Sequence, residues 1–208
     1  MARQSMREEI VVAALDQFHA RGYHGTGVKD ITDAAGVPKG SFYNHFDSKE
    51  TLATVALQRY GEERRLAGLA DTSVEPLARL RAHFEFLREE TEQRHGYARG
   101  CLFGNFGAEI ADHSDAIRDG VRQSFQRWAE AIAATLAQAR DAGAVQADLD
   151  PGKTARFLLN AWQGTLISAR ADRGPDAFDA FFDLTFGTLL ARPEEQPRPT
   201  RQGKARRG

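Results

Sequence analysis

A short polar segment, residues 38–45, carries the side chains of this chain that are best suited to binding chemistry. A helix this short and polar is not stable in isolation, which indicates a binding role. Its N-terminus offers free N–H groups and a positive dipole end to phosphate, asparagine can form two hydrogen bonds with adenine, and lysine prefers guanine. Apart from Phe42, the segment presents Lys39, Gly40, Ser41, Tyr43, Asn44 and His45.

Cys101 is the second candidate for chemistry and the only cysteine, which excludes an internal disulfide and a multi-cysteine zinc site. Gly100 and Gly104 flank it, and we expect it to open a helix. The helix dipole and nearby Arg99 then favour the thiolate. The alternative is a small buried apolar residue, since lone cysteines are commonly structural.

The hypothesis that the protein is a thiol enzyme has little support in the sequence. It would use Cys101 as nucleophile with His83, His95 or His113 as base, but the chain has no nucleophile elbow, phosphate loop or histidine pair four residues apart. Steady turnover of a thiol-reactive substrate would support an enzyme, whereas stoichiometric modification without turnover would argue against one. We expect no enzyme activity, no metal and no cofactor.

The composition is that of a globular protein with one sizeable core or two modest ones. Of 208 residues, 41% are hydrophobic and 27% charged, and the net charge is −1. The net charge therefore predicts neither a nucleic-acid partner nor a membrane surface, and any such activity must come from local patterning. Residues 1–50 alone hold six basic and seven acidic groups. With no bilayer-spanning apolar run and no apolar signal core, we expect a cytoplasmic protein.

Helical spacing recurs along the whole chain, which predicts an all-α fold of about nine helices. An apolar stripe precedes Gly22, a second one spans 28–35, and Pro38 begins a third helix at 38–45 after the Gly36-Val37 turn. This order is the helix-turn-helix arrangement. A fourth helix, from Lys49 toward Leu69, joins this domain, residues 1–50, to a larger helical domain, residues 51–192.

The chain end has a different composition from these two domains. Three prolines and mixed charges predict a disordered basic tail at residues 193–208. Its cations are more consistent with a solubilising end than with a DNA clamp; they are Arg198, Arg201, Lys204, Arg206 and Arg207.

The N-terminal motif resembles the DNA-binding domain of the TetR family of transcriptional regulators. The resemblance spans about residues 5–60 and rests on GYHGTGVKDITDAAGVPKGSFYNHFDSKETL. It implies that Lys39 and Gly40 lie at the major-groove edge, with Ser41 and Asn44 as candidates for base readout. Arg3 and Arg7 could assist from the N-terminal arm. The residues implied to hold phosphates are Thr26, Tyr43, His45 and Lys49.

The same resemblance implies that the larger domain binds a small-molecule inducer. The alternative is that its aromatic stripe is ordinary core. The predicted pocket residues are Phe84, Leu87, Cys101, Phe103, Phe106, Phe125, Trp128 and Trp162, with His83, Asn105, His113 and Gln163 as polar anchors.

The resemblance also implies a homodimer, in which the helices at about 152–171 and 176–191 form a four-helix bundle with a twofold mate. The last helix carries more aromatic surface than its own packing needs, on the argument that Phe178, Phe181, Phe182, Thr185 and Phe186 cannot all face inward. The predicted interface residues are Asn160, Gly164, Ser168, Phe178, Phe181 and Thr185.

The segments RGCLFGNFGAEIADHSDAIRD and NAWQGTLISARADRG resemble the electrophile-sensing, NemR-like and AcuR-like branch of the family. The branch implies a response at Cys101 to reactive carbonyls, quinones, chlorine oxidants or acrylate. Arg170 stands where an amine could otherwise trap an oxidised thiol, which argues against a cysteine–lysine crosslink.

The resulting prediction is a dimeric repressor that an inducer releases from a palindromic operator. Three alternatives stay open: a reversible sensor with a structural Cys101, the thiol enzyme, and a helical interaction module with a vestigial DNA-binding domain.

Overall fold

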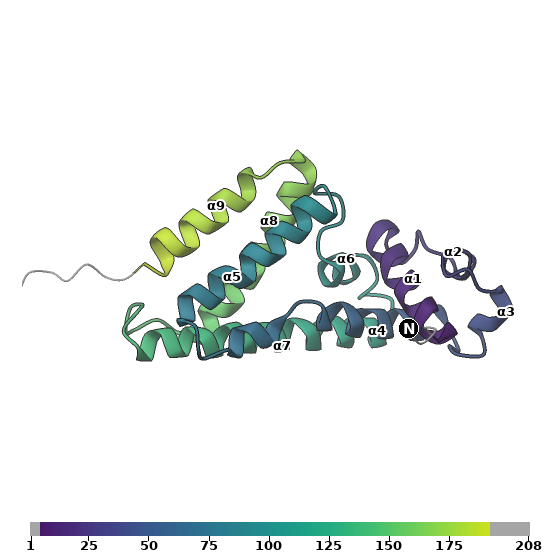
Figure 1. Cartoon of the computed structure of the whole chain (residues 1–208), viewed down its shortest axis with the longest axis horizontal. Coiled ribbons are helices and arrows are strands. Elements are labelled where there is room, and N and C mark those ends of the chain that lie inside the picture. The colour runs from purple at the N-terminus through teal and green to yellow at the C-terminus, as the bar shows by residue number, and fades with distance from the viewer. Residues whose placement is uncertain (1–4, 192–208) are drawn as a thin grey trace, which may run out of the picture.

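The computed structural model describes residues 5–191, and this range is helical throughout, as predicted (Figure 1). None of its helices is long and apolar enough to cross a bilayer. The α-helices are α1 (Met6–Arg21), α2 (Val28–Ala34), α3 (Lys39–Phe42), α4 (Lys49–Glu62), α5 (Pro76–Glu89), α6 (Leu102–Glu109), α7 (Asp115–Asp141), α8 (Pro151–Asp172) and α9 (Asp176–Leu184). Leu66–Ala70 is 3₁₀-helical, and the π-helical turns Glu90–Arg94 and Thr185–Leu189 extend α5 and α9. Arg3 and the tail at 193–208 lie outside the described residues.

The first three helices form a small bundle that packs on α4. Ser5 and Ser48 begin α1 and α4, because each side chain accepts a backbone N–H three residues on. Gly36 makes the turn between α2 and α3 with φ at +68°. Phe42 and Phe46 are buried under α3, so α3 turns its polar side outward.

The 27-residue α7 lies at the centre of the larger domain. Helices α4, α5, α6 and α8 all pack against it (Figure 1). Trp128, Ile132 and Leu136 lie on its buried face at helical spacing. Because α4 belongs to both packing units, a shift of α4 against α7 would move the helix-turn-helix bundle.

Two predicted helix bounds were wrong. The third helix ends at Phe42, and residues 43–45 continue as turns in which Asn44 and His45 donate to carbonyls three residues back. The fourth helix ends at Glu62, because Arg65 adopts left-handed backbone with φ at +53°. The chain then turns so that Leu69 is buried and its carbonyl accepts from Arg79 and Thr135.

Most of the surface predicted to be surplus on the last helix is buried, although Phe186 is only half-buried. Phe178, Phe181, Phe182 and Thr185 are all buried within one chain. Their spacing of three, four and seven residues places them on one helix face, so a single helix can bury them together. Phe178 and Phe181 pack on Trp162 at ring-centroid distances of 5.3 and 5.0 Å. Phe178 is therefore core and not interface.

Candidate DNA-reading face and regulatory site

The α3 surface is the candidate DNA-reading face. Most of its predicted contacts are exposed, namely Lys39, Gly40, Tyr43, Asn44 and His45, and Ser41 is half-buried. Tyr43 is 60% exposed although it is aromatic. Gly40 has nothing within 4 Å of where a Cβ would stand, so the backbone itself is open to a surface. Arg7 stacks over the buried Phe46 ring at 5.2 Å and adds a cation beside this face.

Thr26 and Lys49 occupy different places from those expected of phosphate ligands. Thr26 is fully buried, and its hydroxyl donates to Gly22 O at 2.8 Å, so the phosphate contact predicted for it is wrong. Lys49 Nζ donates to Tyr23 O and Thr26 O, both at 3.1 Å, and lies over the Tyr23 ring. Burial lowers the pKa of Lys49. Its main role in this structure is to hold the α1–α2 turn.

Glu109, at the end of α6, clamps that same turn to the larger domain. Its carboxylate accepts the backbone N–H groups of Tyr23 at 2.9 Å and His24 at 2.7 Å. Gly22 permits this approach, because a Cβ there would lie 2.5 Å from Glu109 Oε2, and its φ of +76° suits glycine. Bonds from neutral donors to a carboxylate are among the stronger ones. The clamp therefore ties α6 to the helix-turn-helix bundle.

Replacing Glu109 by Gln should destabilise the chain by about 1–3 kcal/mol, because an amide can accept only one of the two N–H groups. Urea unfolding measures this loss, and Glu89→Gln, an exposed change on α5, is the matched control. Equal stability of the two variants would show that the clamp contributes nothing.

Cys101 is the N-cap residue of α6, so the prediction that it opens a helix is confirmed. It is only 5% exposed and lies beside the Tyr60 hydroxyl of α4. Burial, and then the thiol beside it, raise the pKa of Tyr60. Arg64 stacks over the Tyr60 ring at 4.1 Å and pairs with Glu90 at 2.8 Å. The nearby Arg99 instead pairs with Asp16 at 2.6 Å.

The loop just before Cys101 also contacts the helix-turn-helix bundle. His19 of α1 donates from Nε2 to Gly100 O at 2.9 Å. Burial lowers the pKa of His19 to about 4, although the Gly100 bond opposes this shift. His95 lies 5.1 Å from His19, ring to ring. Through these contacts, both α1 and α4 are packed around the residue that begins α6.

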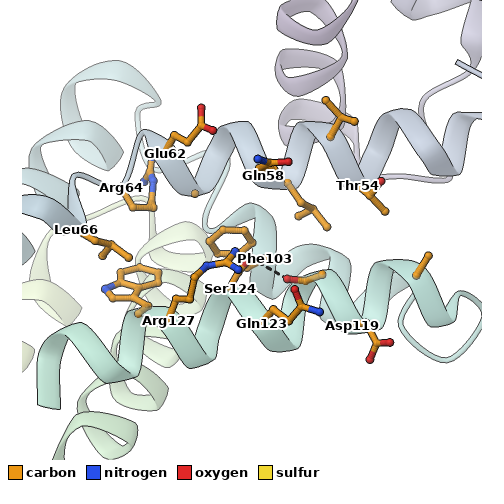
Figure 2. Close-up of a pocket in the computed structure, with 16 residues that line it drawn as sticks. Thr54, Gln58, Glu62, Arg64, Leu66, Phe103, Asp119, Gln123, Ser124 and Arg127 are labelled. Atoms are coloured by element: carbon orange, nitrogen blue, oxygen red, sulfur yellow. Dashed lines mark hydrogen bonds between the residues drawn. The ribbon is translucent and has the colours of Figure 1, made fainter. Parts of the chain in front are cut away.

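A pocket of about 650 Å³ opens between α4 and α7 (Figure 2). Its lining includes the apolar Phe103, Leu57 and Trp128 together with polar residues of both helices. Arg127 reaches into it from α7 and bonds Ser124 Oγ at 3.4 Å. A second pocket of about 500 Å³, the α7–α8 pocket, lies between α7 and α8.

The eight predicted pocket residues do not form one cavity. Phe103 and Trp128 line the α4–α7 pocket and Phe125 lines the α7–α8 pocket. The other five, Phe84, Leu87, Cys101, Phe106 and Trp162, are buried and line neither of these pockets, so the structure does not bring them together with the first three. The aromatic rings interdigitate instead; Phe84, for example, lies 5.1 Å from Trp162 and 4.9 Å from Phe181.

The four predicted polar anchors do not lie together in one pocket either. His83 accepts from Trp128 Nε1 at 2.9 Å, and burial lowers its pKa to about 4. His113 is exposed in a turn, and Asn105 donates to Arg99 O. Of the four, Gln163 lines the α7–α8 pocket, and His83 lines a smaller pocket of about 260 Å³ beside Phe86. Within residues 5–191 no three His, Cys, Asp or Glu side chains gather as metal ligands would.

Sequence reasoning missed His19, Tyr60 and Glu109, which connect the two domains, and Arg64, which packs on Tyr60. Glu109 lies more than 80 residues from its partners, so local spacing gives no sign of the contact. The available signal was the type of these residues: Tyr60 lies on the buried face of α4, and Arg64 follows just after the end of that helix. Buried polar side chains of this kind need partners elsewhere in the fold.

Comparison with known proteins places both domains in one family. Residues 10–55 match the model described as bacterial regulatory proteins, tetR family, and residues 76–184 match the tetracyclin repressor-like C-terminal domain. The chain is 36% identical to the HTH-type transcriptional repressor DhaR of Mycobacterium sp. strain GP1, over 91% of this chain and 95% of that one. It is 35% identical to the transcriptional regulator AcuR of Cereibacter sphaeroides, over 86% and 83%.

Solved structures agree with these matches. A regulatory protein TetR from Rhodobacter sphaeroides has 33% identity and a TM-score of 0.77, over 84% of this chain and 93% of that one. The reduced form of NemR from Escherichia coli has 25% identity and a TM-score of 0.82, over 91% and 99%.

Proposed function

The chain belongs to the TetR family of helix-turn-helix transcriptional repressors, and on that basis we propose that it acts as a homodimer that a small molecule releases from a palindromic operator. The observation that carries the proposal is the α3 surface. There, the exposed Lys39, Tyr43 and Asn44 surround a bare backbone at Gly40. A dimer would present two such surfaces to half-sites separated by about one helical turn of DNA, or by a multiple of it.

An exposed apolar face on α8 and α9 supports the dimer. Phe157, Ile167 and Leu184 are 59%, 71% and 65% exposed. Phe157 and Leu184 line a groove of about 520 Å³ together with Phe181 and Thr185. On α8, Asn160, Gly164 and Ser168 are also exposed. Their small or polar side chains allow another helix to approach closely. Apolar surface of this kind marks an interaction site.

Replacing Ile167 by Asp should convert the dimer to a monomer, because it would bury a charge in an apolar interface. Light scattering after size-exclusion chromatography measures the mass directly. Val74→Asp is the control, since Val74 is also an exposed apolar residue but lies before α5. A dimer that survives Ile167→Asp would place the interface elsewhere.

Cys101 is the proposed point at which an electrophile acts. Its thiol is packed against Tyr60 of α4, and the preceding carbonyl holds His19 of α1. An adduct on a thiol that is 5% exposed needs space that is already filled. The adduct would therefore push α4 and α1 apart from α6 and change the spacing of the two α3 helices. A ligand that bound both conformations equally would have no such effect.

Complete alkylation of Cys101 by N-ethylmaleimide should release the protein from DNA taken from upstream of its gene. Fluorescence anisotropy measures the release, and mass spectrometry confirms one adduct per chain. Cys101→Ser, treated in the same way, should stay bound. Full alkylation without release would make Cys101 a packing residue and leave the reversible, non-covalent inducer as the working alternative.

A further inference from the structure

The α7–α8 pocket holds an unpaired hydrogen-bond donor. Gln163 Nε2 is buried and has no hydrogen-bond partner among the described residues. Leaving such a group unpaired costs about 1–3 kcal/mol, so an unpaired donor beside a cavity calls for an explanation. A bound molecule with an accepting oxygen would supply the missing partner once the amide turned toward the pocket.

The rest of the pocket defines what kind of molecule fits. Its volume is about 500 Å³, within the range of small-molecule sites. Phe125, Ala129, Ala133 and Leu159 give it mostly apolar walls. The charges that line it, Glu130 and Arg156, are both exposed and opposite in sign, so the pocket has no net charge to attract an ion.

Gln163 also contacts the helix that connects the pocket to the DNA-binding domain. Its Oε1 lies 2.6 Å from where a Cβ of Gly104 would stand, so a side chain at position 104 would displace the amide from its present place. Gly104 lies on α6, between Cys101 at one end and the Glu109 clamp at the other. A ligand that draws the Gln163 amide into the pocket would remove a contact from α6.

We propose that the α7–α8 pocket is an effector site for a small, uncharged, largely apolar molecule whose single accepting oxygen bonds Gln163 Nε2. The proposal rests on the proposed function, because it names the ligand class of an effector-released repressor. It adds the site, the anchoring donor and the route through α6 to the Tyr23–His24 turn.

A matched pair of probes tests the donor: acetophenone carries a carbonyl oxygen, and ethylbenzene has a similar shape without one. Isothermal titration calorimetry of the full chain should give roughly 10-fold tighter binding of acetophenone. Gln163→Leu should remove this preference. Gln126→Leu should keep it, because Gln126 lines the same pocket but its amide already donates to Glu130 at 2.9 Å.

A second variant acts on the same contact from the other side. Gly104→Ala would push the Gln163 side chain from its place and should also lower the preference. Thermal unfolding of each variant checks that it is folded. A preference that survives Gln163→Leu, or a wild-type chain that binds acetophenone no better than ethylbenzene or binds neither probe, would overturn the proposal. Anisotropy on upstream DNA with the same samples separates the two claims, because intact DNA binding leaves the proposed function standing.

Discussion

Replacing Lys39 by Glu should lower the affinity for the proposed operator by roughly 30-fold or more. Lys39 is exposed at the start of α3, where the family resemblance places the edge of the major groove. A lost base or phosphate contact costs about 1–3 kcal/mol, and a dimer loses it in both half-sites, which gives about 2–6 kcal/mol. Titration of labelled DNA by fluorescence anisotropy measures the loss.

Lys153→Glu is the control for this change. It alters net charge by the same amount, but Lys153 is exposed on α8, outside the helix-turn-helix bundle. Its affinity should stay close to that of the wild type. If both variants lost affinity equally, DNA binding would depend on overall charge and not on the α3 face. For Lys39→Glu, the magnitude of the slope of log affinity against log salt should decrease by about 1 for each phosphate contact that the change removes.

Acidification from pH 7 to pH 5 lowers the free energy of unfolding by about 2 kcal/mol for each of two buried histidines. Burial lowers the pKa of His19 and of His83 from 6.5 to about 4. Between these two values the unfolded chain binds more protons than the folded chain, so stability falls as pH falls. Over the whole window each histidine accounts for about 3 kcal/mol. Burial also lowers the pKa of half-buried His95, which acts in the same direction.

Urea unfolding at the two pH values tests this linkage. His83→Gln should remove about 2 kcal/mol of the pH dependence, since an amide oxygen can still accept from Trp128 Nε1 without titrating. His113→Gln, an exposed change, is the control and should keep the wild-type dependence. A His83→Gln variant with the full wild-type pH dependence would contradict the assignment of a neutral, buried imidazole.

The helix-turn-helix bundle was predictable because its signals are local. Gly36 has a positive φ, Phe42 and Phe46 are four residues apart, and the polar residues of segment 38–45 stand on both sides of Phe42. The bounds of the short helix were less predictable, because residues 43–45 continue in turns whose carbonyl acceptors differ by only one residue from helical ones.

The regulatory site was less predictable from sequence. Aromatic stripes at helical spacing describe a core and a ligand pocket equally well, so the packed Phe84 and Trp162 could not be distinguished from the pocket-lining Phe125. The contacts between domains join residues far apart in the chain, such as Glu109 with Tyr23. Only the folded chain brings these groups together.

The most direct test of the central claim, that the α3 face reads a specific operator, is fluorescence anisotropy of the full chain on DNA from upstream of its gene. A scrambled duplex of the same length and composition is the comparison, at physiological salt. We expect saturable binding to the upstream DNA that is at least about 10³-fold tighter than binding to the scrambled duplex. Equal affinity for the two duplexes would contradict the claim.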